Sequence, residues 1–252
     1  FLQHFLPGQA IEENGHDSIG LQSIWTNPRG NLRAGLEMEY TQAYLKETQP
    51  SAIEGSAFLE ATIPPGKHYD YDVDGQLMGV FVRREFAASD QLSITAGLRF
   101  QHTRYDYDNR MISGRSRDDG TPCGFGGCRF NRPDDREDSF NDWSPKLGLI
   151  YDISDNRQIF GSLSRGFRAP QATELYRLQN AQNVTDIEPV ELSAIEIGFR
   201  GFAKKVDYTV NVYSMEKDNF IFRDTSRMNI DGGETSHRGL EVDLAYRIAQ
   251  HL

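Results

Sequence analysis

The stretch Gly-Leu-Glu-Val-Asp-Leu-Ala-Tyr-Arg-Ile, at positions 239–248, alternates apolar side chains with small or charged ones. Successive side chains of a β-strand point to opposite sides of the sheet, so the stretch predicts a strand with one apolar and one polar face. The apolar face is formed by Leu240, Val242, Leu244, Tyr246 and Ile248. Positions 92–100 divide in the same way, with Leu92, Ile94, Ala96, Leu98 and Phe100 on one side. Strands of this kind have an apolar environment on one face of the sheet and a polar environment on the other.

Nine segments of the chain have the character of strands. They lie at about 17–26, 31–47, 73–87, 91–108, 140–153, 157–167, 190–202, 205–217 and 236–249. Short turns at 27–30, 88–90, 154–156 and 203–204 alternate with long polar connectors at 48–72, 109–139, 168–189 and 218–235. Bacterial outer-membrane barrels have this asymmetry, with short periplasmic turns and longer extracellular loops. The sequence therefore predicts an all-β fold, an antiparallel up-and-down transmembrane β-barrel, of which these nine strands are a part.

The alternation is also compatible with a soluble β-sandwich, such as a glycan-binding module, whose apolar faces would be buried against each other. The length of the segments favours the barrel. Segments 31–47 and 91–108 are about three times as long as the usual strand of five or six residues.

Composition and motifs exclude several classes of function. The formal net charge of −10 argues against a nucleic-acid partner, because phosphate binding requires clustered lysine and arginine. The mean hydropathy is −0.60, and no stretch approaches the roughly 18–20 apolar residues of a membrane-spanning helix. No residues have the spacing of a nucleophile elbow or a metal-ligand pair. We therefore expect a protein that is not an enzyme, with no catalytic residues, no resident metal and no cofactor.

Four motifs resemble TonB-dependent outer-membrane receptors. The first is Gly-Ser-Leu-Ser-Arg-Gly-Phe-Arg-Ala-Pro at 161–170 with Thr-Glu-Leu-Tyr at 173–176, and the others lie at 141–149, 187–200 and 237–242. The residues of the first motif are Arg165, Gly166, Phe167, Arg168, Ala169, Pro170, Glu174 and Leu175. Val190, in the motif at 187–200, departs from the family pattern, which has Glu directly after the proline that is Pro189 here. The 168–189 connector contains no histidine, which disfavours haem as a cargo.

The resemblance implies a 22-stranded barrel closed by an N-terminal plug domain, located in the bacterial outer membrane. On this view residues 1–252 are an internal fragment of the barrel domain, without the plug. The implied partners are outer-membrane lipid, a TonB complex reached through the N-terminal region, and a small-molecule metal chelate. The implied activity is import of a scarce nutrient, most often a ferric siderophore, so a ferric chelate is cargo rather than cofactor. A passive porin is the alternative within the membrane.

Aromatic and arginine side chains gather around the long connectors. The candidate ligand-binding residues are Tyr69, Tyr71, Tyr105, Tyr107, Arg115, Arg117, Arg129 and Arg132. Arginine and tyrosine together suit an anionic chelate, through paired hydrogen bonds and cation–π contact. The same tyrosines are also typical of the aromatic girdle of a barrel.

Cys123 and Cys128 in the 109–139 connector predict either a disulfide or, with less support from neighbouring residues, a two-thiolate metal site. Arg165, Arg168 and Glu174 are expected to form one charged network that shapes the loop.

Overall fold

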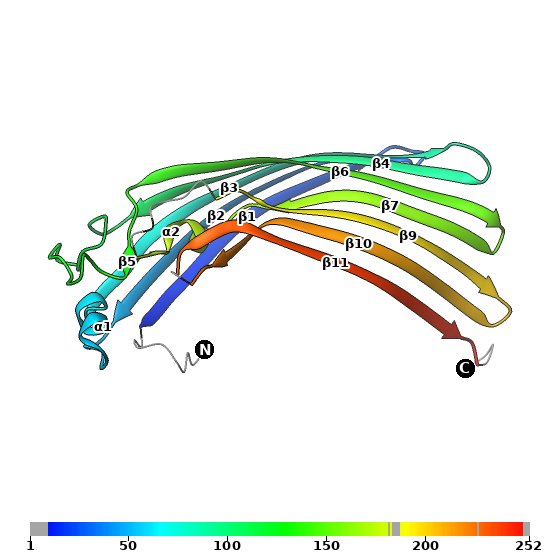
Figure 1. Ribbon diagram of the computed structural model, residues 1–252. Helices are drawn as coiled ribbons and strands as arrows, with labels where there is room; N and C mark the ends of the chain where they lie inside the picture. The colour runs from blue at the N-terminus through cyan, green and yellow to red at the C-terminus, as the bar shows by residue number, and fades with distance from the viewer. Residues whose placement is uncertain (1–9, 181, 183–186, 226, 249–252) are drawn as a thin grey trace.

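Nine long strands form a single antiparallel sheet in the computed structural model, which describes residues 10–180, 182, 187–225 and 227–248. The strands are neighbours in the order in which the chain visits them (Figure 1). Their bounds are β1 (Ile11–Thr26), β2 (Leu32–Gln49), β3 (Gly66–Ala87), β4 (Leu92–Asn109), β6 (Arg136–Ser154), β7 (Arg157–Arg168), β9 (Val190–Ala203), β10 (Val206–Arg223) and β11 (Asn229–Tyr246). This up-and-down order confirms the predicted fold class.

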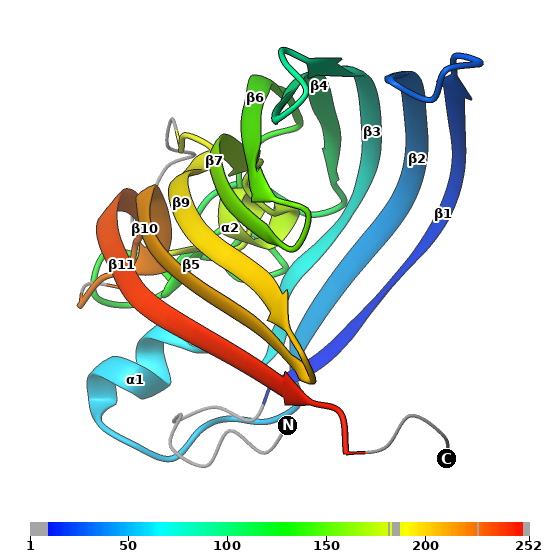
Figure 2. The ribbon, with the colours of Figure 1, turned by 90° about the vertical axis from the view of Figure 1, so that its right-hand side faces the viewer.

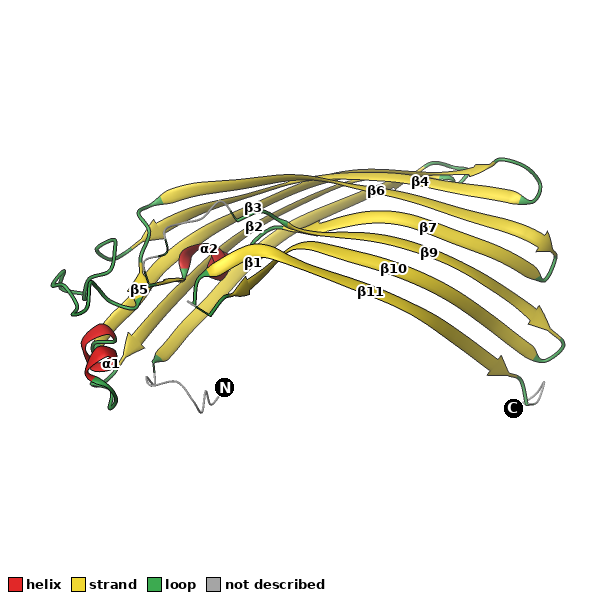
Figure 3. Ribbon diagram, viewed as in Figure 1, coloured by secondary structure: helices red, strands yellow, loops and turns green. Residues whose placement is uncertain are grey.

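The sheet curls into an open trough, with β1 along one edge and β11 along the other (Figure 2). All the tight turns lie at one end of the strands, and all the long connections lie at the opposite, long-loop end (Figure 1). The long-loop end also carries the small elements, shown in Figure 3. They are α1 (Ala57–Thr62), β5 (Phe130–Asn131), α2 (Ala172–Tyr176) and β8 (Leu178–Gln179), of which β5 and β8 pair with each other. Neither described helix has the length and apolar character needed to cross a membrane.

The strands extend further toward the long-loop end than the sequence predicted. β3 begins at Gly66 instead of about 73, and β1 begins at Ile11 instead of about 17. The predicted long connector at 218–235 is wrong for most of its length, because β10 continues to Arg223 and β11 starts at Asn229. Positions 181 and 183–186 of the 168–189 connector, and position 249 of the last predicted strand, lie outside the described residues.

The apolar faces of the strands join into one continuous outer surface. Residues that are opposite each other in register share a face, and Leu163 pairs with Ile195 while Val212 pairs with both Ile197 and Leu240. Leu240 and Val242 are 65% and 57% exposed, so no second layer covers them in the described part of the chain. The soluble sandwich is therefore excluded, because its apolar faces would be buried between two sheets.

The opposite faces line the inside of the trough with paired polar groups. Arg99 on β4 forms an ion pair of 2.7 Å with Glu37 on β2, across the intervening strand. Asn211 on β10 donates hydrogen bonds to Glu196 at 3.0 Å and to Glu241 at 3.2 Å. An apolar exterior and a polar, hydrogen-bonded interior are typical of a transmembrane barrel.

A candidate binding site at the long-loop end

The main buried core lies beneath the loops at the long-loop end, where the connectors fold back over the inner face of β2, β3 and β4. Three of the predicted ligand-binding tyrosines belong to this core: Tyr69, Tyr71 and Tyr107 are 1%, 3% and 1% exposed. The alternation Tyr-Asp-Tyr-Asp at 69–72 and 105–108 explains their direction, because it points every tyrosine inward and every aspartate outward. Tyr176 of α2 stacks on Tyr107 with 4.3 Å between the ring centroids. Tyr176 thus packs the part of the 168–189 connector that forms α2 onto the sheet through aromatic contacts.

The loop that contains the two cysteines is held from within by Arg132, which is 1% exposed. Its guanidinium donates hydrogen bonds to the backbone carbonyl oxygens of Ile112, Ser116 and His68 at 2.6, 2.7 and 3.1 Å. Burial lowers the pKa of Arg132, and the three carbonyl groups compensate for the lost hydration. At the tip of the loop, the sulfur atoms of Cys123 and Cys128 are joined in a disulfide.

The motif at 161–170 and 173–176 forms a capped turn, not one large charged network. Arg168 forms a two-pronged ion pair with Glu174, at 2.9 and 3.0 Å. Glu174 also accepts a hydrogen bond of 2.7 Å from the backbone N–H of Gln171, which caps α2. Arg165 is not part of this group, because it pairs with Glu191 on β9 instead. The expectation of one network of Arg165, Arg168 and Glu174 is therefore wrong in its first member: Arg165 lies on the outward face of β7, and Arg168 on the inward face.

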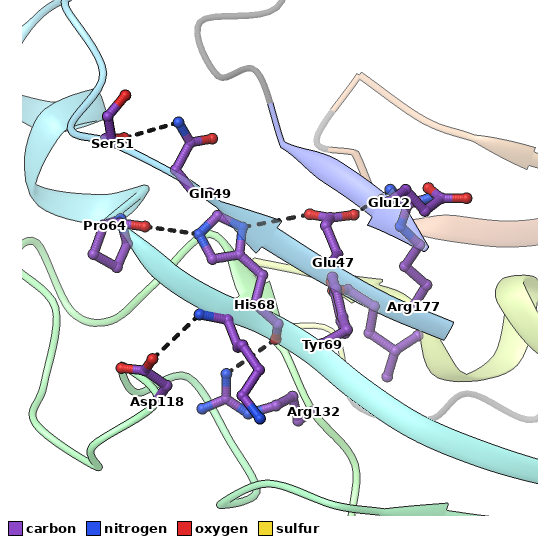
Figure 4. Close-up of polar contacts among 12 residues, drawn as sticks. Glu12, Glu47, Gln49, Ser51, Pro64, His68, Tyr69, Asp118, Arg132 and Arg177 are labelled. Carbon is purple, nitrogen blue, oxygen red and sulfur yellow. Dashed lines mark hydrogen bonds and ion pairs between the residues drawn. The ribbon is translucent and has the colours of Figure 1, made fainter. Parts of the chain in front are cut away.

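From α2 the chain crosses the trough, and Arg177 reaches the first strands of the sheet (Figure 4). Its guanidinium contacts the carboxylate of Glu12 on β1 at 2.9 Å and that of Glu47 on β2. Burial alone would lower the pKa of Arg177, but the two carboxylates outweigh it and raise the pKa. Arg177 therefore remains charged, and it ties the 168–189 connector to the opposite side of the trough.

Glu47 has a second partner on the next strand, the imidazole of His68. Nδ1 of His68 lies 3.4 Å from Glu47, and Nε2 lies 2.8 Å from the backbone oxygen of Pro64 (Figure 4). The side chains of His68 and Glu47 are 6% and 11% exposed. Tyr69 adds a hydrogen bond from its hydroxyl to the carbonyl oxygen of Leu178, immediately after Arg177.

Six arginines at this end form no ion pair with a carboxylate among the described residues, Arg115, Arg117 and Arg132 among them. The other three, Arg129, Arg223 and Arg227, influence one another electrostatically. They come from the disulfide loop, the end of β10 and the β10–β11 turn. Burial and the positive charge of Arg227 lower the pKa of Arg129. Arg223 lies within electrostatic range of Arg227 as well. The structure thus concentrates positive charge where several loops meet, in a chain whose net charge is −10.

A pair of exposed aromatic rings adjoins one of these arginines, Arg129. Phe58 of α1 and Phe125 of the disulfide loop are 45% and 67% exposed, and their rings meet edge to face at 5.4 Å. The guanidinium of Arg129 lies over the Phe58 ring, 5.8 Å from its centroid. Phe125 has a φ of 51°, a left-handed conformation that is unfavourable for a residue with a side chain. The strained loop thus presents an apolar ring to solvent.

The residues predicted from the sequence to bind a ligand all lie at the long-loop end, but the structure encloses half of them. Arg115, Arg117, Arg129 and Tyr105 keep partly exposed side chains, whereas Tyr69, Tyr71, Tyr107 and Arg132 are enclosed by the loops. Contact of the enclosed residues with a ligand requires the loops to move, and it stays a prediction. Phe58, Phe125, Arg223 and Arg227 were not predicted. The flanking glycines at 124 and 126 were a usable signal for Phe125, since an aromatic ring between glycines in a disulfide loop is exposed on a turn.

The sequence from residue 8 to residue 250 matches the family model described as "TonB dependent receptor-like, beta-barrel". The chain belongs to the TonB-dependent receptor family. Members of this family are transporters of bacterial outer membranes, not enzymes. The nine-stranded sheet is accordingly a section of a TonB-dependent receptor barrel, and its outward apolar face is the surface that such barrels turn to lipid.

Individual members of the family are only distantly similar in sequence. The ferric-pyoverdine BN7/BN8 receptor of Pseudomonas putida is 21% identical over 199 residues, which cover 78% of this chain and 22% of the receptor. The copper transporter OprC superposes with a TM-score of 0.67 at 14% identity, over 98% of this chain and 38% of the transporter. The ferric yersiniabactin uptake receptor FyuA of Yersinia pestis gives 0.63 at 13% identity, over 96% of this chain and 34% of the receptor. The chain thus spans between about a fifth and two fifths of the length of these proteins, and the solved structures show the shared fold alone.

Proposed function

We propose that this chain is part of an outer-membrane receptor that imports a negatively charged metal chelate, a ferric siderophore, with energy supplied by a TonB complex. The observation that carries the proposal is the meeting of Arg129, Arg223 and Arg227 at the long-loop end without a carboxylate partner among the described residues. Guanidinium groups bind the oxygens of an anionic ligand through paired, charge-assisted hydrogen bonds. An anion held among these arginines would also relieve their mutual repulsion.

The neighbouring rings support a chelate that has planar or aromatic parts. Phe58 and Phe125 offer apolar surface beside the Arg129 guanidinium, and an aromatic ligand gains from stacking and from the adjacent cation. Two of the similar proteins are named for ferric chelates, pyoverdine and yersiniabactin, which supports the same class of cargo. The long-loop end is then the extracellular mouth of the barrel. The TonB complex acts on regions of the receptor outside this sheet.

The proposal is tested in the source bacterium by deleting the full-length gene under iron limitation. Uptake of radioactive iron is measured with ferric pyoverdine, ferric citrate and ferric yersiniabactin as separate probes. Loss of uptake of one chelate, restored by the intact gene and abolished by inactivating TonB, supports the proposal. Undiminished uptake of every ferric chelate, together with lost uptake of a copper complex, would replace iron by copper as the cargo.

A second experiment tests the arginines themselves. Arg129→Gln, Arg223→Gln and Arg227→Gln are introduced singly into the full-length receptor, and binding of the transported chelate is measured in detergent. Each loss of a charge-assisted hydrogen bond is expected to weaken binding by about tenfold. Arg157→Gln is the matched control, because Arg157 begins β7 at the short-turn end and is exposed. Equal affinity in all four variants would place the cargo elsewhere.

A further inference from the structure

Three cationic side chains share one row on the inner face of the sheet, in the half of the strands nearer the short turns. Arg33 of β2 lies directly opposite Arg83 of β3, Arg83 lies opposite Gly97 of β4, and Gly97 lies opposite Lys146 of β6. The next residue of β6, Leu147, belongs to the apolar outer surface, so Lys146 and the residues of its row point into the trough. We call Arg33, Arg83 and Lys146 the inner basic row.

The inner basic row has little negative charge beside it. Among the described residues, Arg33 and Lys146 form no ion pair, and Arg83 reaches Glu85 only at 3.9 Å. The side chains of Arg83 and Glu85 are 51% and 54% exposed, and an exposed pair contributes little. Like charges directly opposite each other on neighbouring strands destabilise a sheet. Arg33 and Arg83 therefore repel each other across the β2–β3 pair without full compensation.

Other arginines of the inner face are matched with acidic side chains. Arg99 contacts Glu37 at 2.7 Å, and Arg247, which follows β11, contacts Asp207 of β10 at 3.0 Å. Uncompensated positive charge is thus not a general property of the inner face. The inner basic row is a local excess of positive charge, in a chain whose net charge is −10.

Open space lies beside the cations. A cavity of about 50 Å³ is lined by Arg33, Arg83 and Glu85, among others. A space of this size admits one carboxylate or phosphate group, since a water molecule takes up roughly 30 Å³. Between Arg83 and Lys146 the sheet carries Gly97, where an added Cβ atom would lie 3.8 and 3.9 Å from their Cβ atoms. Because the glycine has no side chain, a ligand lying over it is within reach of both cations.

From the row and the space beside it we infer that the inner wall holds a second anion-binding site, separate from the arginines at the long-loop end. Its ligand is a small molecule with carboxylate or phosphate groups. One such group lies between the guanidinium groups of Arg33 and Arg83, which bind it through paired hydrogen bonds, and Lys146 attracts another. For the natural ligand the inference rests on the proposed function: the anionic chelate that enters at the long-loop end meets this row on its way inward.

The first test uses the unmodified full-length receptor in detergent, with metal-free citrate as the probe. The arginine reagent phenylglyoxal is added with and without citrate, and the labelling of each arginine is measured by mass spectrometry. Citrate is expected to slow the labelling of Arg33 and Arg83 by about three- to tenfold, as one charge-assisted hydrogen bond implies. Arg247 is the control, because Asp207 already pairs with it. Equal labelling with and without citrate overturns the inference, including the case in which an acidic segment of the receptor itself keeps the labelling slow in both samples.

The second test connects the site with import. The double variant Arg33→Gln, Arg83→Gln is compared with Arg247→Gln in the full-length receptor. The probe is ferric pyoverdine, ferric citrate or ferric yersiniabactin, whichever the receptor imports. The double variant is expected to bind this chelate with unchanged affinity in detergent but to import it about tenfold more slowly. Equal import by both variants, or a loss of affinity as large as the loss of import, overturns a separate second site.

The two tests also separate this inference from the proposed function. Citrate protection of Arg33 and Arg83 without import of any ferric chelate would refute the proposed function alone. Import of a ferric chelate without citrate protection would refute the second site alone. The labelling experiment needs no variant, so its result holds even if the double variant fails to fold.

Discussion

Arg177 follows Glu47 by 130 positions in the chain, and yet its guanidinium donates a hydrogen bond to that carboxylate. The two residues belong to opposite sides of the open trough, one following α2 between β7 and β9, the other on β2. The contact therefore closes a loop over the interior instead of strengthening neighbouring strands. Glu47 is largely buried, so the loss of its partner leaves a charge without full compensation.

Replacement of Arg177 by glutamine is expected to free the 168–189 connector. We expect a cost of about 1–2 kcal/mol in the local opening free energy, which raises the open population about 5–30-fold. Chymotrypsin reports on this opening, because its cleavage sites at Leu175 and Tyr176 are 2% and 0% exposed in the closed form. The initial cleavage rate of the full-length receptor should rise accordingly. Lys46→Gln is the control, since the Lys46–Glu13 pair is exposed and contributes little. Equal cleavage rates in both variants would contradict the prediction.

The disulfide between Cys123 and Cys128 is expected to stabilise the tip of its loop and little else. Closing so short a loop contributes about 2 kcal/mol by restricting the open chain. The rest of the loop is held separately by Arg132. Hydrogen exchange of a Cys123→Ser, Cys128→Ser receptor should therefore be faster at the tip, including the Gly124 N–H that bonds to Ala61 at 3.2 Å. Exchange at β5 and β6 should be unchanged. Faster exchange throughout the sheet would show that the disulfide supports more than the tip.

The sequence was sufficient to predict the number and order of the nine long strands, and the faces of those that alternate cleanly, since these follow from the alternation and from the turns. It did not reveal how far the strands continue toward the long-loop end. The stretch at 218–235 looks like a loop because it has no regular apolar alternation. Its two arms nevertheless pair as a hairpin, with Phe222 opposite Ile230 and with Ile221, 7% exposed, in the buried core beneath the loops. An apolar stripe is required only where one face meets lipid or a core.

The candidate site was harder to predict for a different reason. The sequence indicates that Tyr69 and Tyr107 share a face, but it does not show which connector folds back over that face. Their burial depends on Tyr176 and on the reach of Arg177, which are contacts between distant parts of the chain. Long-range contacts of this kind leave no local pattern, so residues expected to meet a ligand are enclosed instead.

Glycines on the inner face of the sheet leave room for aromatic rings of neighbouring strands. Substitution of Gly198 tests this packing. A Cβ atom at Gly198 would lie 2.2 Å from the ring of Phe160 on the neighbouring strand. Gly198→Val must displace that ring, and we expect a loss of about 1–3 kcal/mol in the free energy of unfolding. Gly166→Val is the matched control, because nothing lies within 4 Å of the added atom. Urea unfolding of the full-length receptor in detergent compares the two. Equal midpoints would mean that the ring of Phe160 is not held over the glycine.

The outward face of β11 and the inward face of the adjacent β10 should differ in how well they tolerate a new positive charge. Val242 is 57% exposed at the middle of the outward apolar row, and an arginine there costs about 2–4 kcal/mol when the face meets the bilayer core. Thr209 on β10 points inward, directly opposite Asp243, so Thr209→Arg gains a nearby carboxylate in a polar interior. The amount of folded receptor recovered from outer membranes should therefore fall sharply for Val242→Arg and little for Thr209→Arg. The reverse order would place water on the apolar face, and the assignment of that face to lipid would fail.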